Sequence, residues 1–231
     1  MLRNLISKFI FIIKKKEFEL DENISTHYLI ILVFEKIIML LRGYSYLKLA
    51  RRGRFFFVGK GTKIKCTSKI TVGNGVVIDR NCYLDALSIK GILLKSNTSI
   101  GMNSTIICSG TYNNLGVGLE VGSGVGLGTH GFFGCAGGIK IGNNTIFGNF
   151  VSMHSENHNF SDTEILIKDQ GVNRKGINIG DNCWIGSKVT ILDGAVIEDG
   201  VIIAAGAVVK GGVYTKNGIY GGVPAKFLKI R

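Results

Sequence analysis

Aliphatic residues return at every sixth position toward the C-terminus of this chain. From residue 179 to 209 they are Ile179, Ile185, Ile191, Ile197, Ile203 and Val209, and the next residue is usually small. An α-helix would space them by three and four, and a half-buried strand would alternate apolar and polar residues over a short run. A sustained period of six is typical of a hexapeptide solenoid, a parallel β-helix in which each repeat forms one flat face.

The same period extends upstream in four further runs. Their anchors are Val72, Ile78 and Leu84, then Leu94, Ile100 and Ile106, then Val121, Leu127 and Phe133, and then Ile141, Phe147 and Met153. Since three hexads make one triangular turn, the pattern predicts an all-β solenoid of roughly eight turns over residues 58–210. An irregular segment interrupts it at 108–120, and at 154–178 the chain leaves the solenoid as a loop and returns in phase.

Residues 1–57 follow a different pattern and predict an N-terminal helical region. The segment Tyr28–Leu41 is apolar almost all round and is broken only by Glu35 and Lys36. It is shorter than the run of about 20 apolar residues that spans a bilayer, so we expect a helix that caps the solenoid or lies on a membrane surface. The apolar run Phe9–Ile13 is followed directly by lysines without a cleavage site, so we expect it to be retained.

Charge and composition narrow the classes of partner. Of the formal net charge of +12, +9 falls within residues 1–65, where 14 Lys and Arg stand against 5 Asp and Glu. The basic flank of the apolar run consists of Arg42, Lys48, Arg51, Arg52 and Arg54. No DNA- or RNA-binding motif accompanies it, so we expect no nucleic acid partner. We expect a cytoplasmic protein, peripheral on the cytoplasmic face of the inner membrane through residues 1–57.

The five cysteines are widely spaced and include no CxxC pair. They predict small buried side chains in a reducing compartment, in preference to a disulfide framework or a zinc site. The 33 glycines and the single proline suit a chain of many tight turns, without a collagen period.

The loop at 154–178 holds the candidate chemistry, because a long loop on a regular scaffold is usually functional. It contains His154 and His158, whereas the chain has no nucleophile elbow, Walker loop or Rossmann fingerprint. A histidine beside a rigid wall is suited to act as a general base toward a hydroxyl or an amine. Position alone leaves a structural role open for both histidines, and for His130 on a repeat face.

Three motifs carry a resemblance to a known family: SENHNFSD at 155–162, INIGDNCWIGSKVTIL at 177–192 and GGVPAKFLK at 221–229. Residues 58–231 resemble the hexapeptide-repeat acetyltransferases, most of all the branch that O-acetylates sugars and polysaccharides and includes maltose and galactoside acetyltransferases. The resemblance implies a left-handed β-helix, a homotrimer with active sites between subunits, and acetyl-CoA as donor. It implies no metal, and a zinc site of His130, His154 and His158 lacks the histidine spacing of the zinc-binding β-helices.

The resemblance also implies roles for individual residues. His158 matches the catalytic histidine, which takes the proton of the acceptor as the acceptor attacks the thioester directly. Positions implied to bind the cofactor are Trp184, Ser187, Ala205, Lys210, Lys226 and Lys229. Among these, Lys210 stands one position before the family's usual lysine, and Trp184 is expected to contact either the cofactor or the adjoining subunit.

The expected function is therefore acetyl-CoA-dependent O-acetylation of a sugar hydroxyl in a surface-polysaccharide or glycolipid precursor. One alternative is N-acetylation of an amino-sugar nucleotide, which the lack of an N-terminal nucleotide-binding βαβ unit disfavours. Another is a non-catalytic trimeric solenoid that serves as a scaffold. Residues 211–231 form a tail in which Pro224 predicts the start of a short C-terminal helix, AKFLKIR.

Overall fold

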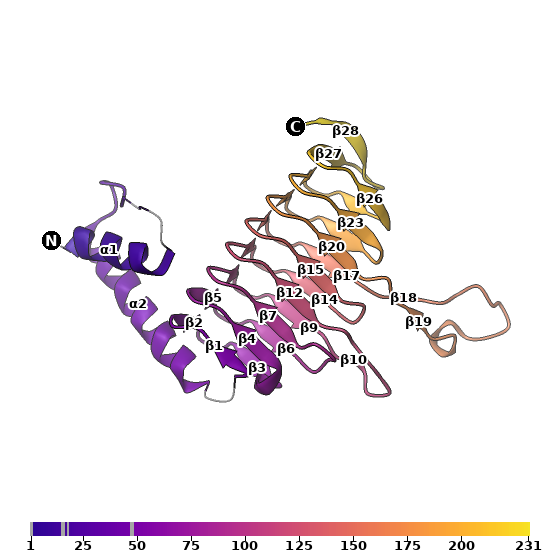
Figure 1. Cartoon of the computed structure of the whole chain (residues 1–231), viewed down its shortest axis with the longest axis horizontal. Helices are drawn as coiled ribbons and strands as arrows, with labels where there is room; N and C mark the ends of the chain where they lie inside the picture. Colours follow the sequence, from indigo (N-terminus) through magenta and orange to yellow (C-terminus); the bar gives the residue numbers. More distant parts are fainter. Residues whose placement is uncertain (1, 15–16, 18, 47–48) are drawn as a thin grey trace.

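The computed structural model describes residues 2–14, 17, 19–46 and 49–231. Two helices, α1 (Leu2–Lys14) and α2 (Thr26–Ser45), precede a long triangular solenoid of short parallel strands (Figure 1). The solenoid is a left-handed parallel β-helix, as predicted, and its first sheet stacks eight strands. The helical N-terminal region is confirmed as well.

Three sheets, called A, B and C here, form the sides of the triangle. Sheet A contains β1 (Arg51–Arg52), β4 (Ile70–Val72), β7 (Ile92–Leu94), β12 (Leu119–Val121), β15 (Ile139–Ile141), β20 (Ile177–Ile179), β23 (Ala195–Ile197) and β26 (Gly212–Tyr214). Sheet B contains β2 (Phe56–Val58), β5 (Val76–Ile78), β8 (Ser99–Ile100), β13 (Gly126–Leu127), β16 (Ile146–Phe147), β21 (Trp184–Ile185), β24 (Ile202–Ile203), β27 (Gly218–Gly221) and β28 (Lys226–Ile230). Sheet C contains β3 (Lys63–Lys65), β6 (Tyr83–Asp85), β9 (Thr105–Ile107), β14 (Phe132–Gly134), β17 (Ser152–His154), β22 (Thr190–Leu192) and β25 (Val208–Val209).

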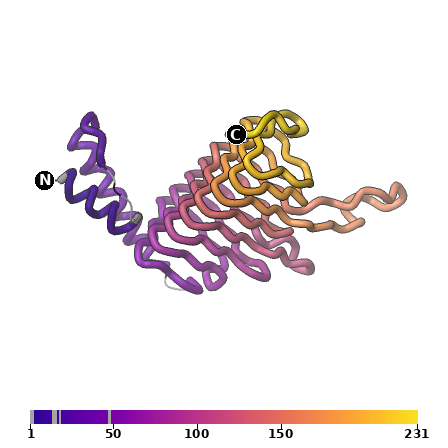
Figure 2. The backbone as a smooth tube through the Cα atoms, turned by 45° about the horizontal axis from the view of Figure 1, so that its top comes forward, coloured from indigo at the N-terminus to yellow at the C-terminus, as the bar shows by residue number. Residues whose placement is uncertain are grey.

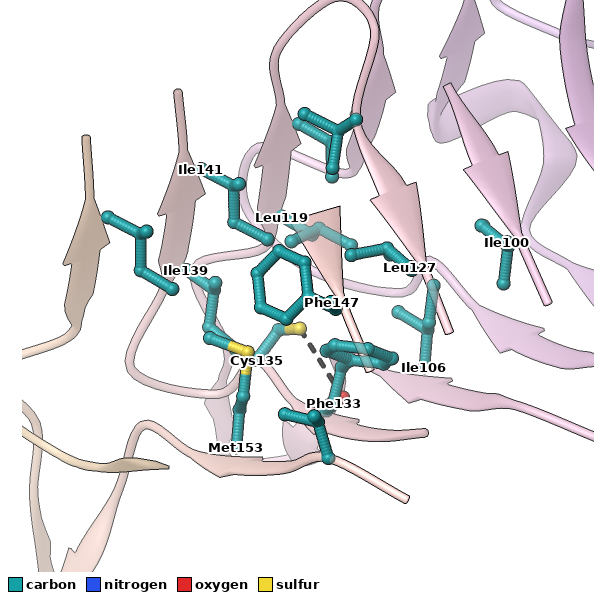
Figure 3. Close-up of a cluster of buried hydrophobic side chains, with 14 of the residues drawn as sticks. Ile100, Ile106, Leu119, Leu127, Phe133, Cys135, Ile139, Ile141, Phe147 and Met153 are labelled. Atoms are coloured by element: carbon teal, nitrogen blue, oxygen red, sulfur yellow. Dashed lines mark hydrogen bonds between the residues drawn. The ribbon is translucent and has the colours of Figure 1, made fainter. Parts of the chain in front are cut away.

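The predicted anchors of the hexads fill the interior of the triangle, and every one of them is buried. Equivalent positions pair in register from turn to turn, as Ile141 does with Ile179 across sheet A. In the middle turns the rings of Phe133 and Phe147 meet edge to face at 6.5 Å (Figure 3). Each fully buried aliphatic side chain contributes about 1.5–3 kcal/mol, so stability accumulates turn by turn.

The N-terminal helices sit at the first turn of the solenoid (Figure 2). The C-terminal half of α2 packs on β2, where a Cβ at Gly43 would stand 1.8 Å from the carbonyl oxygen of Phe56, so only glycine fits. Arg42 Nη1 donates to the Val58 carbonyl at 2.7 Å. Neither helix of the described chain is long and apolar enough to cross a membrane. Lys48 of the predicted basic flank lies outside the described residues.

The predicted C-terminal helix is wrong, because Lys226–Ile230 forms the strand β28. It runs antiparallel to β27, and Phe227 packs its ring against Tyr220 at 5.6 Å. The last turn of a β-helix leaves a row of unpaired backbone N–H and C=O groups at its edge. Pairing with the edge of β27 therefore stabilises Lys226–Ile230 as a strand, although the local sequence of this segment favours a helix.

Candidate active site

Two hairpins leave the solenoid at the same corner, where sheet C passes to sheet A (Figures 1 and 2). The first contains β10 (Gly110–Thr111) and β11 (Asn114–Leu115), and the second contains β18 (Asn157–His158) and β19 (Val172–Asn173). The first hairpin follows β9 and the second follows β17, two turns later. The predicted loop is thus a folded hairpin with a neighbour on the same corner.

Arg174 joins the two hairpins through a half-buried side chain. Its Nε donates to Glu156 Oε2 at 2.6 Å, which ties the two ends of the second hairpin together. Its Nη1 donates to Asn114 Oδ1 at 2.9 Å and to the Leu115 carbonyl at 3.0 Å, and its Nη2 donates to the Asn114 carbonyl at 3.1 Å. One guanidinium therefore fixes the second hairpin against the first, using the planar fork of donors that only arginine offers.

Two further polar side chains hold the second hairpin in shape. Gln170 Nε2 donates to the carbonyls of Asp162 and Ile165, both at 2.7 Å, which closes the tip. At the root, the buried carboxylate of Asp193 accepts hydrogen bonds from the backbone N–H groups of Lys175 and Gly176, at 2.9 and 2.7 Å. A charged acceptor of this kind fixes the point at which the chain rejoins the solenoid.

His158 lies on β18, where its backbone pairs with Val172, and its side chain is exposed. The side chain makes no hydrogen bond to any part of the chain that the structure describes. His154 lies at the end of β17 on the outer face of sheet C, with its Nε2 at 3.2 Å from Ser152 Oγ and its ring against Phe132. Both imidazoles are thus exposed beside the C-to-A corner, and only that of His154 is oriented by the wall.

His130 stands apart from this pair at the corner between sheets B and C. Its ring stacks on Phe150 at 4.7 Å, and its Nε2 lies 2.9 Å from Asn103 Nδ2, so it is held on both sides by the solenoid. Among the described residues, no three His, Cys, Asp or Glu side chains gather closely enough to hold a metal ion.

Three of the predicted cofactor residues gather at the B-to-C corner of two successive turns. Trp184 projects from sheet B and is 53% exposed, and Ser187 follows it in the turn. The next turn places Ala205 over the same corner, where Gly206 N donates to the Ser187 carbonyl at 2.9 Å. A Cβ at Gly186 would stand 2.5 Å from the backbone nitrogen of Ala205, so the turns stack closely and leave a smooth wall.

The predicted lysines divide between two places. Lys229 pairs with Ile219 on β27, which continues the outward row of Trp184 and Ile202 across sheet B. Lys226 pairs with Gly221 on the same strand pair, and both lysines are exposed. Lys210, in contrast, follows β25 and lies at the C-to-A corner, on the same edge as the second hairpin.

One chain therefore does not bring the predicted base and the predicted cofactor wall together. The hairpin of His158 leaves the edge of sheet C where β17 ends, whereas Ser187 and Ala205 lie at the edge where β22 and β25 begin. The width of a sheet, on the order of 15 Å for a strand and its turn, separates these edges.

Sequence reasoning missed two residues that shape this region, Arg174 and Asp193. Arg174 is one of several cations in the loop, and its partners at 114–115 are distant in sequence. Asp193 stands two residues after the anchor Ile191, where other turns carry small residues such as Ala86 and Ser155, and this is the one signal that could have marked it. Both act by positioning backbone, and nothing in their spacing indicates that role.

Comparison with known proteins supports the repeat and the fold. Residues 176–211 match the family model described as bacterial transferase hexapeptide (six repeats). A probable acetyltransferase of Mycobacterium tuberculosis, Rv3034c, is 34% identical over 59 residues, which cover 26% of this chain and 20% of that protein. The match thus spans about a fifth of the length of this curated relative.

Among solved structures, the N-acyltransferase AntD from Bacillus cereus shares the fold. A mutant of AntD in complex with dTDP-4-amino-4,6-dideoxyglucose and coenzyme A overlays with a TM-score of 0.56 at 19% identity, covering 83% of this chain and 89% of that chain. AntD in complex with dTDP and 3-hydroxybutyryl-CoA overlays with a TM-score of 0.54 at 15% identity, covering 83% and 88%. Residues 176–211 thus carry the repeat of bacterial hexapeptide transferases, and the three-sided solenoid shares the fold of AntD.

Proposed function

We propose that this protein is an acetyl-CoA-dependent O-acetyltransferase that acts on a sugar hydroxyl of a surface-polysaccharide or glycolipid precursor. The observation that carries the proposal is the rigid hairpin that presents His158 beside the β-helix, held in place by Arg174. The family match and the coenzyme A complexes of AntD support an acyl donor of this class. The motifs around His158 and at 221–229 favour a hydroxyl acceptor.

In this proposal the active site lies between two subunits of a homotrimer. One subunit supplies His158 and Lys210 from its C-to-A corner, and its neighbour supplies the wall of Ser187 and Ala205. The separation of these edges within one chain supports a shared site, because closed oligomers bring unlike edges of neighbouring subunits together.

The residues of the wall suit coenzyme A in size and charge. Small side chains at Ser187 and Ala205 leave room for an extended arm along the corner, and the exposed Trp184 offers a flat apolar surface. Lys226 and Lys229 carry exposed positive charge at the end of the same sheet, which suits the phosphates. When bound, acetyl-CoA supplies an acetyl group activated as a thioester.

The role of His158 is to move one proton. A neutral imidazole nitrogen accepts the proton of the acceptor hydroxyl as that oxygen becomes a nucleophile, and the imidazolium returns the proton to the leaving thiolate. An exposed hairpin suits this task, since the acceptor must approach from solvent. His154, four residues earlier and already oriented by Ser152, is the one competing base that the geometry favours.

The test is acetyl transfer from acetyl-CoA to a panel of acceptors, with products identified by mass spectrometry. We expect transfer to a sugar hydroxyl, and we expect His158→Ala to lower kcat by about 10²–10⁴-fold while coenzyme A still raises the melting temperature. His154→Ala and His130→Ala are the matched controls and should retain most of the activity. Full activity of His158→Ala would show that His158 is not the base. Loss of activity in His154→Ala alone would assign the role of base to His154.

The same panel separates the alternatives. Preferential transfer to nucleotide-linked amino sugars, the ligand class found with AntD, would show N-acylation instead. A protein that neither transfers acetyl groups nor is stabilised by coenzyme A would be a solenoid scaffold, and the proposed function would then fail.

A further inference from the structure

An exposed apolar stripe runs along α2, on the side that the described part of the chain leaves uncovered. Its members are Ile30, Phe34, Ile37, Leu41 and Tyr44, with Ile31 and Ile38 at its flank. Phe34 and Leu41 are each 64% exposed. Spacings of four and three residues place all five principal members on one face of the helix.

The opposite face of α2 is the one that contacts the β-helix. Arg42 bonds to the Val58 carbonyl, the Lys36 ammonium lies 5.9 Å from the centre of the Phe57 ring, and Gly43 rests against Phe56. The helix is thus apolar on both sides, because Leu29 is buried within the protein while the stripe is left in solvent. Such an arrangement needs a second apolar environment outside the chain.

The stripe ends at a basic groove of about 810 Å³ beside the first turns of sheet A. Tyr44 lines this groove, and Arg52 covers its ring at 4.6 Å while Nη1 of Arg52 donates to the Tyr44 carbonyl. Arg51, Arg54 and Lys95 also line it. None of the described residues that line the groove is acidic, although Lys95 forms an exposed ion pair with Glu120 next to it.

We propose that α2 and this groove dock the protein on a membrane surface that contains anionic phospholipids. The apolar stripe enters the boundary between headgroups and acyl chains, and the arginines bind lipid phosphates at the level of Tyr44. A helix with an apolar face and neighbouring cations binds in this way without spanning the bilayer. The proposal concerns a surface remote from His158 and does not depend on the acetyl-transfer activity.

Charge and length both favour lipid over a second copy of this chain. The protein carries +12 overall, and residues 66–231 still carry +3, so another copy is itself basic and matches a groove of arginines poorly. The stripe spans two heptads, whereas a coiled coil sustains three or four. An anionic membrane surface offers negatively charged headgroups directly above an apolar layer of acyl chains. The arginines of the groove match the headgroups, and the apolar stripe beside them matches the acyl layer.

The experiment is cosedimentation of the full-length protein with vesicles of phosphatidylcholine, either pure or with about one third phosphatidylglycerol. We expect binding to the anionic vesicles, at least tenfold weaker binding to the neutral ones, and loss of binding as salt is raised. Phe34→Ser with Leu41→Ser should weaken binding at least tenfold, because both side chains leave water in the bound state. Arg51→Ser with Arg54→Ser should weaken it about thirtyfold, and only on anionic vesicles.

Matched controls keep the test specific. Lys168→Ser with Lys216→Ser removes the same charge from exposed sites far from α2 and should leave vesicle binding unchanged. Circular dichroism melting checks that each variant folds, and sedimentation velocity records its oligomeric state. Equal binding of all variants, or no binding by the wild type, would overturn the proposal. A fall in oligomeric mass in the Phe34 and Leu41 variant, without vesicle binding by the wild type, would show that another copy covers the stripe.

Discussion

Replacing Arg174 by alanine tests whether one side chain holds the candidate active site together. The substitution removes the ion pair with Glu156 and three hydrogen bonds to the β10–β11 hairpin, at Asn114 and Leu115. None of these contacts belongs to the hexad core. We therefore expect the second hairpin to open locally while the β-helix stays folded.

The size of the effect follows from burial of the contacts. The side chains of Arg174 and Glu156 are 14% and 28% exposed, so water screens their contact only in part. Hydrogen bonds to charged groups contribute about 1.5–3 kcal/mol each in net terms. Water rehydrates those partner groups of Arg174 that lie at the surface, so not all four contacts count in full. Counting the half-buried ion pair and one of the carbonyl bonds at about 1.5 kcal/mol each gives about 3 kcal/mol for local opening, which is roughly a hundredfold change in the open population.

Amide hydrogen exchange measures this opening directly. In Arg174→Ala the amides of 156–175 should exchange roughly a hundredfold faster, while those of sheets A, B and C keep their rates. Arg174→Lys should recover only part of the protection, because an ammonium lacks the planar fork. Lys168→Ala, which removes an exposed ion pair with Asp169, is the control that should change nothing. Unchanged exchange in Arg174→Ala would refute the argument that this side chain fixes the hairpin.

Two further predictions concern the core. Ile185→Ala empties a fully buried anchor and should lower the free energy of unfolding by about 2–5 kcal/mol, measured in urea, and a loss below about 1 kcal/mol would contradict its place in the stack. Burial raises the pKa of the Cys82, Cys135 and Cys183 thiols, most strongly at Cys135, so a thiol reagent at neutral pH should label only the exposed Cys66 quickly. Labelling of Cys135 in the native protein at the same rate would show that the middle turns open readily.

The period of six predicted most of the fold because the buried position of each hexad can be identified from its aliphatic residue alone. An anchor such as Ile179 occupies the same place in its turn as Ile141 does one turn earlier, so local sequence and long-range packing agree. The C-terminal strand had no such signal. Residues 226–230 pair with an edge that exists only after the last turn has folded, and Phe227 finds Tyr220 only there.

The candidate site was predictable only in part, for a related reason. The break in the period located the loop, and the resemblance singled out His158 within it. The link from Arg174 to Asn114 crosses 60 residues and depends on two hairpins leaving the same corner, which no local pattern records. The division of His158 and Ala205 between opposite edges of sheet C also needs the order of strands around the triangle.

Mixing two inactive variants tests whether the proposed site is shared between two chains. His158→Ala lacks the base, and Ala205→Trp fills the exposed corner where the cofactor arm is proposed to lie. Each should be folded, trimeric and inactive alone. After unfolding and refolding together in equal amounts, random trimers contain an intact interface at about one site in four, so about a quarter of wild-type activity should return. A mixture that stays as inactive as its parents, in trimers shown to contain both chains, would contradict a site shared between two chains.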